Sequence, residues 1–378
     1  MADGCDRDAR FDRRRTLGAL GLLFVVVHIG IPFAGALAFR RFGDAALKGA
    51  LATRTSDPWI LDALGGLLAR DGQYYLAIAS EGYRSPKSWA FFPLYPLATR
   101  ALGPLLGGAP RAGLAIALVA SLACCAMLYR MAAAASGEAA AARAVALFLA
   151  FPTHFFFSAF YTEALFFAFV ALAMTSSARH RWGLAALAGA LAAATRSSGI
   201  LLVPSLAIAA WRRGDWRTID RRAAWLALVP VGTLAFFAAG YVATGHLDAP
   251  LAAQHAWARK TTFPLLTIAQ AAQDLRLHPF DLQRDIDLAA TLGAFAVAAR
   301  ALRRVDAAQS VYLLLALAMP LSSGLVHSMA RYVAGVPAVY LVLAQDLSSR
   351  RRLFPVLAAS LIAQLWLAIR FCEGVGIV

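Results

Sequence analysis

Two carboxylates stand out in a chain whose other segments are mostly apolar. Asp71 opens the run Asp71–Tyr83 (DGQYYLAIASEGY), and Glu163 lies within the nearly charge-free run Phe155–Phe167. An unpaired carboxylate in the second run is costly, so we expect Glu163 to face a cavity or a cation. A carboxylate within hydrogen-bond reach of a hydroxyl can take its proton while the oxygen attacks another group. The sequence therefore predicts a catalytic site with Asp71 as general base and Glu163 beside it.

Basic and aromatic side chains accompany these carboxylates on the membrane face that we assign as the outer one. Negative charge that develops in a reaction is stabilised by fixed cations, and Arg suits bidentate contact with an anionic group. Aromatic rings can form a wall against which a substrate packs. The residues predicted to bind an anionic group or the rest of a substrate are Arg196, Arg331, Lys260, His255, His327, Tyr74, Tyr75, Tyr83 and Phe92.

Several of these residues have a simpler structural explanation that the sequence leaves open. Asp71 precedes Gly72, and Asp-Gly at the start of a segment suits a helix N-cap or a turn. Glu163 could form only a structural ion pair with Arg196. The arginines could extend to the membrane interface, and the tyrosines could belong to an interfacial aromatic belt. The histidines could be ordinary polar residues.

The amino-acid composition indicates the class of protein to which this chain belongs. The chain has 378 residues, of which 60% are hydrophobic and 15% charged, whereas a soluble domain averages about 45–50% apolar and about 25% charged residues. Lipid offers no water to unpaired backbone groups, so we expect an all-α, polytopic transmembrane protein. We treat residues 1–378 as one integral-membrane domain with roughly ten to twelve membrane segments, some of them short or broken.

The basic residues predict the orientation of these segments. The net charge is +15, but the arginines cluster in short loops between apolar runs, which is typical of a positive-inside bias and not of nucleic-acid binding. We expect residues 1–16 to be a cytoplasmic tail and Leu17–Phe39 to be an uncleaved first span. Residues 40–88 and 245–285 are then the two large extracytoplasmic loops. This assignment of loops to the two sides of the membrane requires that Trp89–Leu106 does not cross the membrane fully but only dips into it.

Four sequence motifs, in order along the chain, point to a known family. Asp71–Ala79 is followed by Gly82-Tyr83 and then by Ala90–Pro96 (AFFPLYP); the later motifs are Phe157–Phe166 (FSAFYTEALF), Thr195–Gly199 (TRSSG) and Arg331-Tyr332 with Pro337. This series resembles the phosphatidylinositol-glycan class V (PIG-V) mannosyltransferase family and its bacterial relatives.

The resemblance implies a GT-C fold, in which membrane helices carry an outer loop with an acidic residue. It implies inverting transfer of a hexose, mannose, from a polyprenyl-phosphate donor to a hydroxyl of a lipid or glycan acceptor. Because the leaving group is a single phosphate, we expect no metal and no cofactor. The Ala- and Arg-rich composition indicates a bacterial inner-membrane protein whose site faces the periplasm or exterior, with membrane lipids and no nucleic acid as partners.

A transporter or flippase of a lipid-linked or small polar substrate is the alternative. It would explain why Glu163 and Arg196 lie within apolar runs. It also predicts broken helices in corresponding halves and a site near the bilayer midplane. The sequence instead concentrates its polar residues on one face.

Overall fold

The computed structural model describes residues 12–43, 45–52, 60, 64–213, 221–257, 259–277 and 280–374. Every regular element within these ranges is a helix, which confirms the all-α prediction. The longer helices are α1 (Arg13–Val25), α2 (Ile31–Phe42), α5 (Leu94–Leu106), α6 (Ala109–Ser136), α7 (Glu138–Ala150), α8 (Glu163–Ala178), α9 (Trp182–Thr195), α10 (Leu202–Arg213), α11 (Val231–Thr244), α13 (Pro264–Leu277), α14 (Leu282–Arg304), α15 (Ala307–Leu321), α17 (Pro337–Asp346) and α18 (Arg350–Cys372).

Shorter helices connect them. The α-helices among these are α3 (Ala45–Ala52), α4 (Asp71–Glu81), α12 (Ala249–Gln254) and α16 (Met329–Ala334). A π-helical turn, η1 (Val26–Gly30), joins α1 to α2, and the 3-10 turns are η3 (Gly65–Leu68), η4 (Pro86–Ala90), η5 (His154–Phe157), η6 (Ser197–Leu201), η7 (Arg221–Leu228) and η8 (His255–Trp257).

Four helical segments are long and apolar enough to cross a membrane: Arg13–Phe42, Ala109–Ser136, Arg222–Thr244 and Arg350–Cys372. Four shorter apolar helices accompany them, as expected from the short runs in the sequence: Glu163–Ala178, Trp182–Thr195, Ser197–Trp211 and Ala307–Leu321. The protein is therefore an integral membrane protein, while the total of ten to twelve segments stays a prediction. Helix α5 has only 13 residues, fewer than the roughly 20 of a full span.

Both predicted outer loops contain helices. Residues 40–88 include α3, η3, α4 and η4, and residues 245–285 include α12, η8 and α13. The predicted cytoplasmic tail 1–16 lies mostly outside the described residues, as do positions 44, 53–59, 61–63, 258 and 278–279 of the two loops. Their assignment to the two sides of the membrane stays a prediction.

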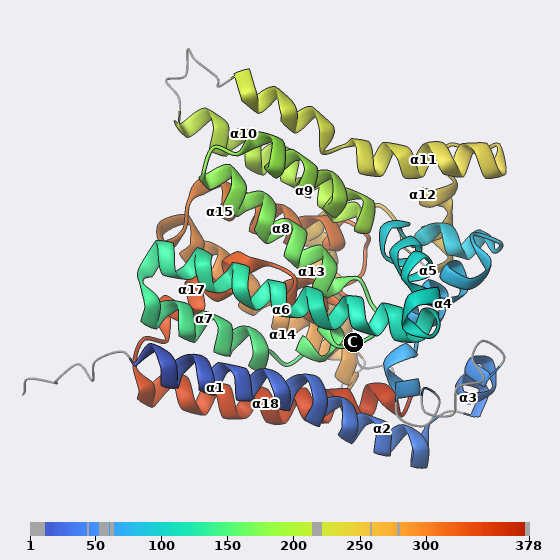
Figure 1. Cartoon of the computed structure of the whole chain (residues 1–378), viewed down its shortest axis with the longest axis horizontal. Coiled ribbons are helices and arrows are strands. Elements are labelled where there is room, and N and C mark those ends of the chain that lie inside the picture. The colour runs from blue at the N-terminus through green and yellow to red at the C-terminus, as the bar shows by residue number, and fades with distance from the viewer. Residues whose placement is uncertain are drawn as a thin grey trace, which may run out of the picture.

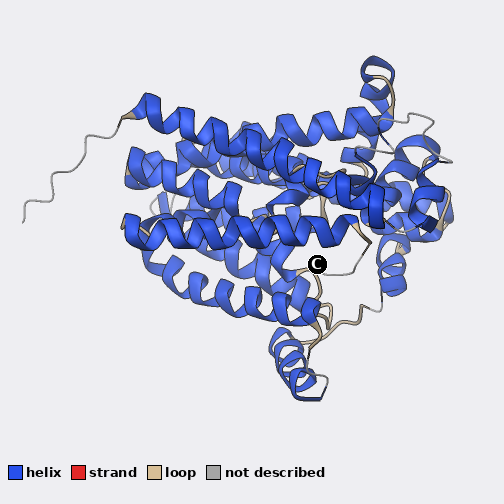
Figure 2. Ribbon diagram, turned by 90° about the horizontal axis from the view of Figure 1, so that it is seen from below, coloured by secondary structure: helices blue, strands red, loops and turns tan. Residues whose placement is uncertain are grey.

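The long helices are stacked as roughly parallel rods (Figure 1). Helices α1 and α18 lie at one edge of the stack and α10 and α11 at the other, with α7, α6, α8 and α9 between them. Helices α2 and α18, from opposite ends of the chain, lie side by side. Helices α4, α5 and α12 gather at one end of the stack, and Figure 2 likewise shows short helices and loops at one end.

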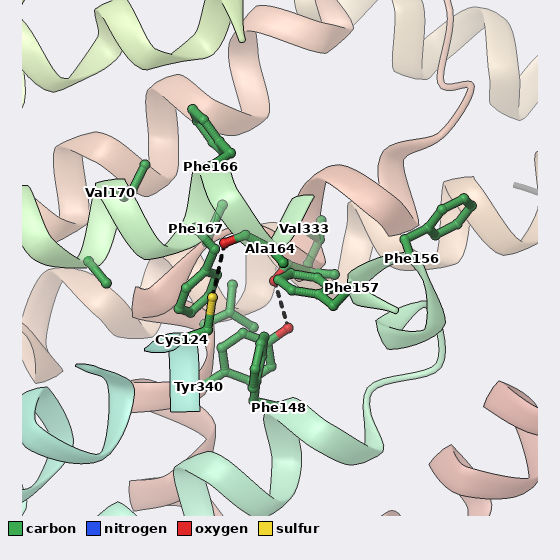
Figure 3. Close-up of a cluster of buried hydrophobic side chains, with 14 of the residues drawn as sticks. Cys124, Phe148, Phe156, Phe157, Ala164, Phe166, Phe167, Val170, Val333 and Tyr340 are labelled. Carbon is green, nitrogen blue, oxygen red and sulfur yellow. Dashed lines mark hydrogen bonds between the residues drawn. The ribbon is translucent and has the colours of Figure 1, made fainter. Parts of the chain in front are cut away.

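A buried aromatic core ties together the helices that carry the site (Figure 3). The Phe148 ring packs edge-on against Phe157, with 4.9 Å between centroids, and against Tyr340 at 5.2 Å. The Tyr340 hydroxyl donates to the carbonyl of Ala334 (2.8 Å), and Cys124 Sγ donates to the carbonyl of Ala164 (3.1 Å). The core thus links the start of α8 and the end of α16 to α6, α7 and α17.

Candidate functional site

A cavity of about 1040 Å³ opens at the end of the bundle where the short helices gather. Its wall combines side chains that lie far apart in sequence, from α4, α8, α9, α11, α12, α14, α15, α16 and α18. Most of the residues that the sequence singled out line it: Asp71, Glu163, Arg196, Arg331, Lys260, His255, His327, Tyr75 and Phe92.

Tyr74 and Tyr83 lie outside the lining and support it from behind. The Tyr74 ring stacks on Phe91 with 4.8 Å between centroids. The Tyr83 ring stacks on Trp89 at 4.4 Å, and its hydroxyl donates to the carbonyl of Phe91 at 2.7 Å. Both tyrosines therefore hold Phe91, which itself lines the cavity.

Two carboxylates and two guanidiniums meet in the cavity wall and form what we call the charge network (Asp71, Glu163, Arg196 and Arg331). Asp71 Oδ2 lies 3.0 Å from Arg331 Nη1. Glu163 Oε1 lies 2.5 Å from Arg196 Nη1 and 3.4 Å from Arg331 Nε, so one carboxylate oxygen bridges both arginines. Glu163 Oε2 is buried and makes no hydrogen bond within the described part of the chain. The network therefore holds equal numbers of positive and negative charges.

The backbone places Asp71 at the mouth of the cavity as the first residue of α4. The residue before it, Arg70, has φ 59° and ψ −122° and is one of few non-glycine residues here with positive φ; such strain clusters at functional sites. The Asp71 amide donates to the Tyr161 hydroxyl (3.2 Å), which donates to the carbonyl of Ala69 (3.1 Å). Asp71 is not the N-cap of α4, which is Arg70, and its carboxylate accepts from Arg331, so capping does not account for its position.

Glu163 reaches the same point because the loop before α8 is locked to the loop before α4. The Phe160 amide donates to the carbonyl of Leu67 at 3.0 Å. The Phe160 ring lies so close to α6 that a Cβ at Gly113 would come within 2.1 Å of it. Only glycine permits this approach, and α8 then begins at Glu163 with the side chain 3% exposed.

The two arginines of the charge network lie where the long helices are interrupted. Arg196 ends α9 in an extended conformation and also donates to Thr162 Oγ1 at 3.2 Å. Arg331 lies in the six-residue helix α16, with its guanidinium 5.3 Å from the centroid of the Phe156 ring and 5.6 Å from that of Tyr161. Aromatic faces stabilise partly desolvated guanidiniums, so both cations are held with little freedom.

Sequence reasoning missed Arg259 and Tyr332 as site residues, although both line the cavity. Arg259 donates to Gln254 Oε1 (2.6 Å) and to the Tyr332 hydroxyl (3.1 Å), and no carboxylate of the described residues pairs with it. Burial alone would raise the pKa of the Tyr332 phenol, but the guanidiniums of Arg259, Arg331 and Arg196 outweigh it and lower that pKa. The signal was present, since Arg259 adjoins Lys260 and Tyr332 adjoins Arg331.

His327 lies in the loop before α16, with Nδ1 2.8 Å from Gln283 Nε2. Burial lowers the pKa of His327, and the positive charges of Arg331 and Arg259 lower it further. Both effects favour the neutral imidazole, which offers a hydrogen bond rather than a positive charge. His255, by contrast, is exposed at the rim, in η8.

The sequence of this chain is similar to that of a known protein family. Residues 56–261, more than half of the chain, match the family described as mannosyltransferase (PIG-V). The GPI alpha-1,6-mannosyltransferase 2 of Mus musculus is 33% identical over 161 residues, which are 39% of this chain and 32% of the relative. That of Rattus norvegicus is 34% identical over 175 residues, 42% of this chain and 35% of the relative. The alignments thus span about a third of these relatives.

The fold also has a counterpart among solved structures. The crystal structure of ArnT from Cupriavidus metallidurans bound to undecaprenyl phosphate superposes with a TM-score of 0.55 at 15% identity, covering 90% of this chain and 62% of ArnT. The GT-C fold implied by the sequence motifs is therefore confirmed. The family match includes Asp71, Glu163 and Arg196. This chain belongs to the PIG-V mannosyltransferase family.

Proposed function

We propose that this protein is an inverting membrane glycosyltransferase that moves a hexose, mannose, from a polyprenyl-phosphate donor to a hydroxyl of a lipid or glycan acceptor. The observation that carries the proposal is the partly exposed Asp71 carboxylate at a large cavity, paired with Arg331 in a charge network that also contains Glu163. Membership of the PIG-V family supports mannose as the sugar. The undecaprenyl phosphate bound to the structural neighbour supports a polyprenyl-phosphate donor.

The reaction needs one base and an environment that accepts a phosphate. Asp71 takes the proton of the acceptor hydroxyl while its oxygen bonds to the anomeric carbon. The bond from that carbon to the phosphate oxygen breaks, and the leaving polyprenyl phosphate keeps the electron pair. A single displacement of this kind inverts the anomeric configuration. The orphaned Glu163 Oε2 is a further acceptor, suited to a sugar or acceptor hydroxyl.

The donor phosphate fits best on the side of the cavity formed by Arg259 and Lys260. Arg196 and Arg331 already contact carboxylates, whereas Arg259 contacts only neutral groups among the described residues. A guanidinium without a counter-ion gains most from an anionic ligand. Lys260 and the Tyr332 hydroxyl line the same cavity and would add donors to the phosphate. Arg331 then serves chiefly to orient Asp71.

The helix hairpin α8–α9 supports an extracytoplasmic site. Glu163 begins α8 and Arg196 follows the end of α9, while the turn Arg179–Arg181 lies at the opposite end of both helices. A basic turn favours the cytoplasmic side. The cavity would then face the periplasm or exterior of a bacterial inner membrane. Its place at one end of α8 and α9 favours transfer at the surface over the midplane site of a transporter.

Sugar transfer to membrane acceptors tests the proposed function directly. The purified protein is reconstituted in liposomes with radiolabelled hexoses linked to dolichyl or undecaprenyl phosphate and with a lipid extract as acceptor source. We expect label to move from the mannosyl donor into a new lipid or glycan with inverted configuration. Transport of the intact donor across the bilayer without a new glycosidic bond would instead establish the flippase alternative.

Replacing Arg259 with Met tests the assigned phosphate subsite. A charged hydrogen bond contributes about 1.5–3 kcal/mol, so we expect the KM for the lipid donor to rise about 10- to 100-fold, with a smaller change in kcat. The matched control is Arg276→Met, which removes an exposed guanidinium of α13 outside the cavity and should leave both constants unchanged. An unaltered donor KM in Arg259→Met would move the phosphate to Arg196 or Arg331.

A further inference from the structure

Asp287 is a fully buried carboxylate of α14 that lies outside the cavity lining. Its Oδ2 accepts the backbone N–H of Ser328 at 2.8 Å, and its Oδ1 accepts the N–H of Ala330 at 2.9 Å. Both carboxylate oxygens therefore accept hydrogen bonds from the backbone at the start of α16. A buried carboxylate is stable only when its charge is balanced by such contacts, so these two hydrogen bonds fix α16 against α14.

The backbone that Asp287 anchors is strained at Ser328. Ser328 has φ 64° and ψ 18°, in the left-handed region, and its side chain is buried. Residues with a Cβ adopt this conformation at a cost of about 1–2 kcal/mol. The hydrogen bond from Ser328 to Asp287 offsets that cost, and the turn at Ser328 directs the chain into α16.

Helix α16 cannot fix itself, because it has only six residues and isolated helices of this length do not form in water. Hydrogen bonds that tie its backbone to other elements include the two to Asp287, one from Thr153 Oγ1 to the carbonyl of Ala330 (3.0 Å) and one from the Tyr340 hydroxyl to the carbonyl of Ala334 (2.8 Å). Arg331 follows directly on the anchored Ala330. The place of its guanidinium beside Asp71 therefore depends on the start of α16.

We infer that Asp287 is a positioning residue of the site: it anchors the start of α16 to α14 and so holds Arg331 in contact with Asp71 and Glu163. The consequence for catalysis rests on the proposed function, but the anchoring does not. Asp287 lies outside the cavity lining, and its side-chain hydrogen bonds in the described part of the chain go to the backbone of residues 328 and 330. It acts through that backbone, with the charge of Arg331 nearby.

The experiment compares Asp287→Asn with the unmodified protein by two measurements. Asn keeps the shape but presents an NH₂ where one backbone N–H needs an acceptor, so deuterium exchange of the amides of residues 328–332 should become at least tenfold faster. Misplacing a catalytic group by about 1 Å costs up to about 100-fold in rate. We therefore expect kcat for sugar transfer to fall by about that factor while the donor KM changes little.

A second substitution separates anchoring from general damage. Ser328→Gly removes the Cβ cost of the left-handed turn, so the double variant Asp287→Asn/Ser328→Gly should recover at least fivefold in kcat over Asp287→Asn. If Asp287→Asn alone does not fold, the effect of that substitution on kcat is measured in the Ser328→Gly background, by comparing the double variant with Ser328→Gly. Thr291→Val is the matched control and should leave kcat unchanged. Within the described part of the chain, this buried hydroxyl on α14 bonds only to the carbonyl of Asp287 (2.7 Å).

The outcomes are distinct from those for the proposed function. Unchanged exchange at residues 328–332, or a kcat loss in Asp287→Asn that glycine at 328 does not relieve, overturns the inference. A protein that transfers no sugar from any donor contradicts the proposed function, and the exchange measurement then still decides whether Asp287 anchors α16.

Discussion

Replacing Asp71 with Asn should lower kcat for sugar transfer by about 10²- to 10⁴-fold, the usual contribution of a general base. The amide retains the size of the side chain and an oxygen that can accept from Arg331, now 3.0 Å from the carboxylate. It cannot accept the proton of the acceptor hydroxyl. Initial rates at saturating donor, measured in liposomes, report the loss directly, and the donor KM should change little.

Two comparisons separate lost chemistry from lost structure in this variant. Asp71 is 29% exposed, but its partner Arg331 is only 9% exposed. Arg331 keeps Glu163 as a counter-ion when Asp71 is neutralised, so the unfolding temperature should fall less than it does on loss of the deeply buried Glu163. Asp274→Asn, at an exposed position of α13 outside the cavity, is the matched neutralisation and should retain full activity. A folded Asp71→Asn protein with near-normal turnover would contradict the assignment of Asp71 as the base.

The sequence alone could point to the charge network because two of its residues break an apolar pattern. Glu163 stands within Phe155–Phe167 and Arg196 within Leu191–Leu202, where a charge without a partner is costly. From the sequence, an ion pair between Glu163 and Arg196 is one possibility, and the structure contains this pair. The sequence could not reveal that the same Glu163 oxygen also contacts Arg331, because that contact depends on how α16 packs against α14, α15 and the η5 turn.

The residues that sequence reasoning missed lack such contrast with their surroundings. Asp287 lies near Asp281 and Asp285 at the start of α14, where acidic residues are common because they suit a helix N-terminus. Its function comes from two backbone groups 41 and 43 residues away, and no local pattern encodes that pairing. Arg259 and Lys260 are neighbours of the same charge, and only the fold decides which one meets Tyr332.

The aromatic residues illustrate the same limit. Tyr74 and Tyr75 are adjacent in α4, so their side chains point in different directions around the helix. Tyr75 lines the cavity, whereas Tyr74 packs behind it on Phe91. An aromatic-rich segment therefore predicts that a wall exists, and the helix rotation fixed by packing decides which rings form its inner surface.

Replacing Glu163 with Gln is expected to have the second large effect, on both activity and stability. Glu163 is 3% exposed and balances Arg196 and Arg331, which are 17% and 9% exposed. Removing one partner of a buried ion pair costs about 3–5 kcal/mol, because the remaining charges stay desolvated. We expect a lower unfolding temperature and, in protein that is still folded at the assay temperature, a loss of kcat of at least tenfold, since Glu163 and both arginines line the substrate cavity.

The chain offers a matched control for this substitution at a distance from the cavity. Asp346, at the end of α17, also bridges two arginines: its carboxylate lies 3.4 Å from Arg300 Nε and 3.7 Å from Arg304 Nη2. Asp346→Asn removes the same kind of bridge from a more exposed position, so its cost in stability is smaller and its kcat should be unchanged. If Glu163→Gln lowers the unfolding temperature but the folded protein keeps the kcat of the unmodified enzyme, Glu163 is only a structural counter-ion, and the catalytic contribution of the network reduces to Asp71 and the arginine that orients it.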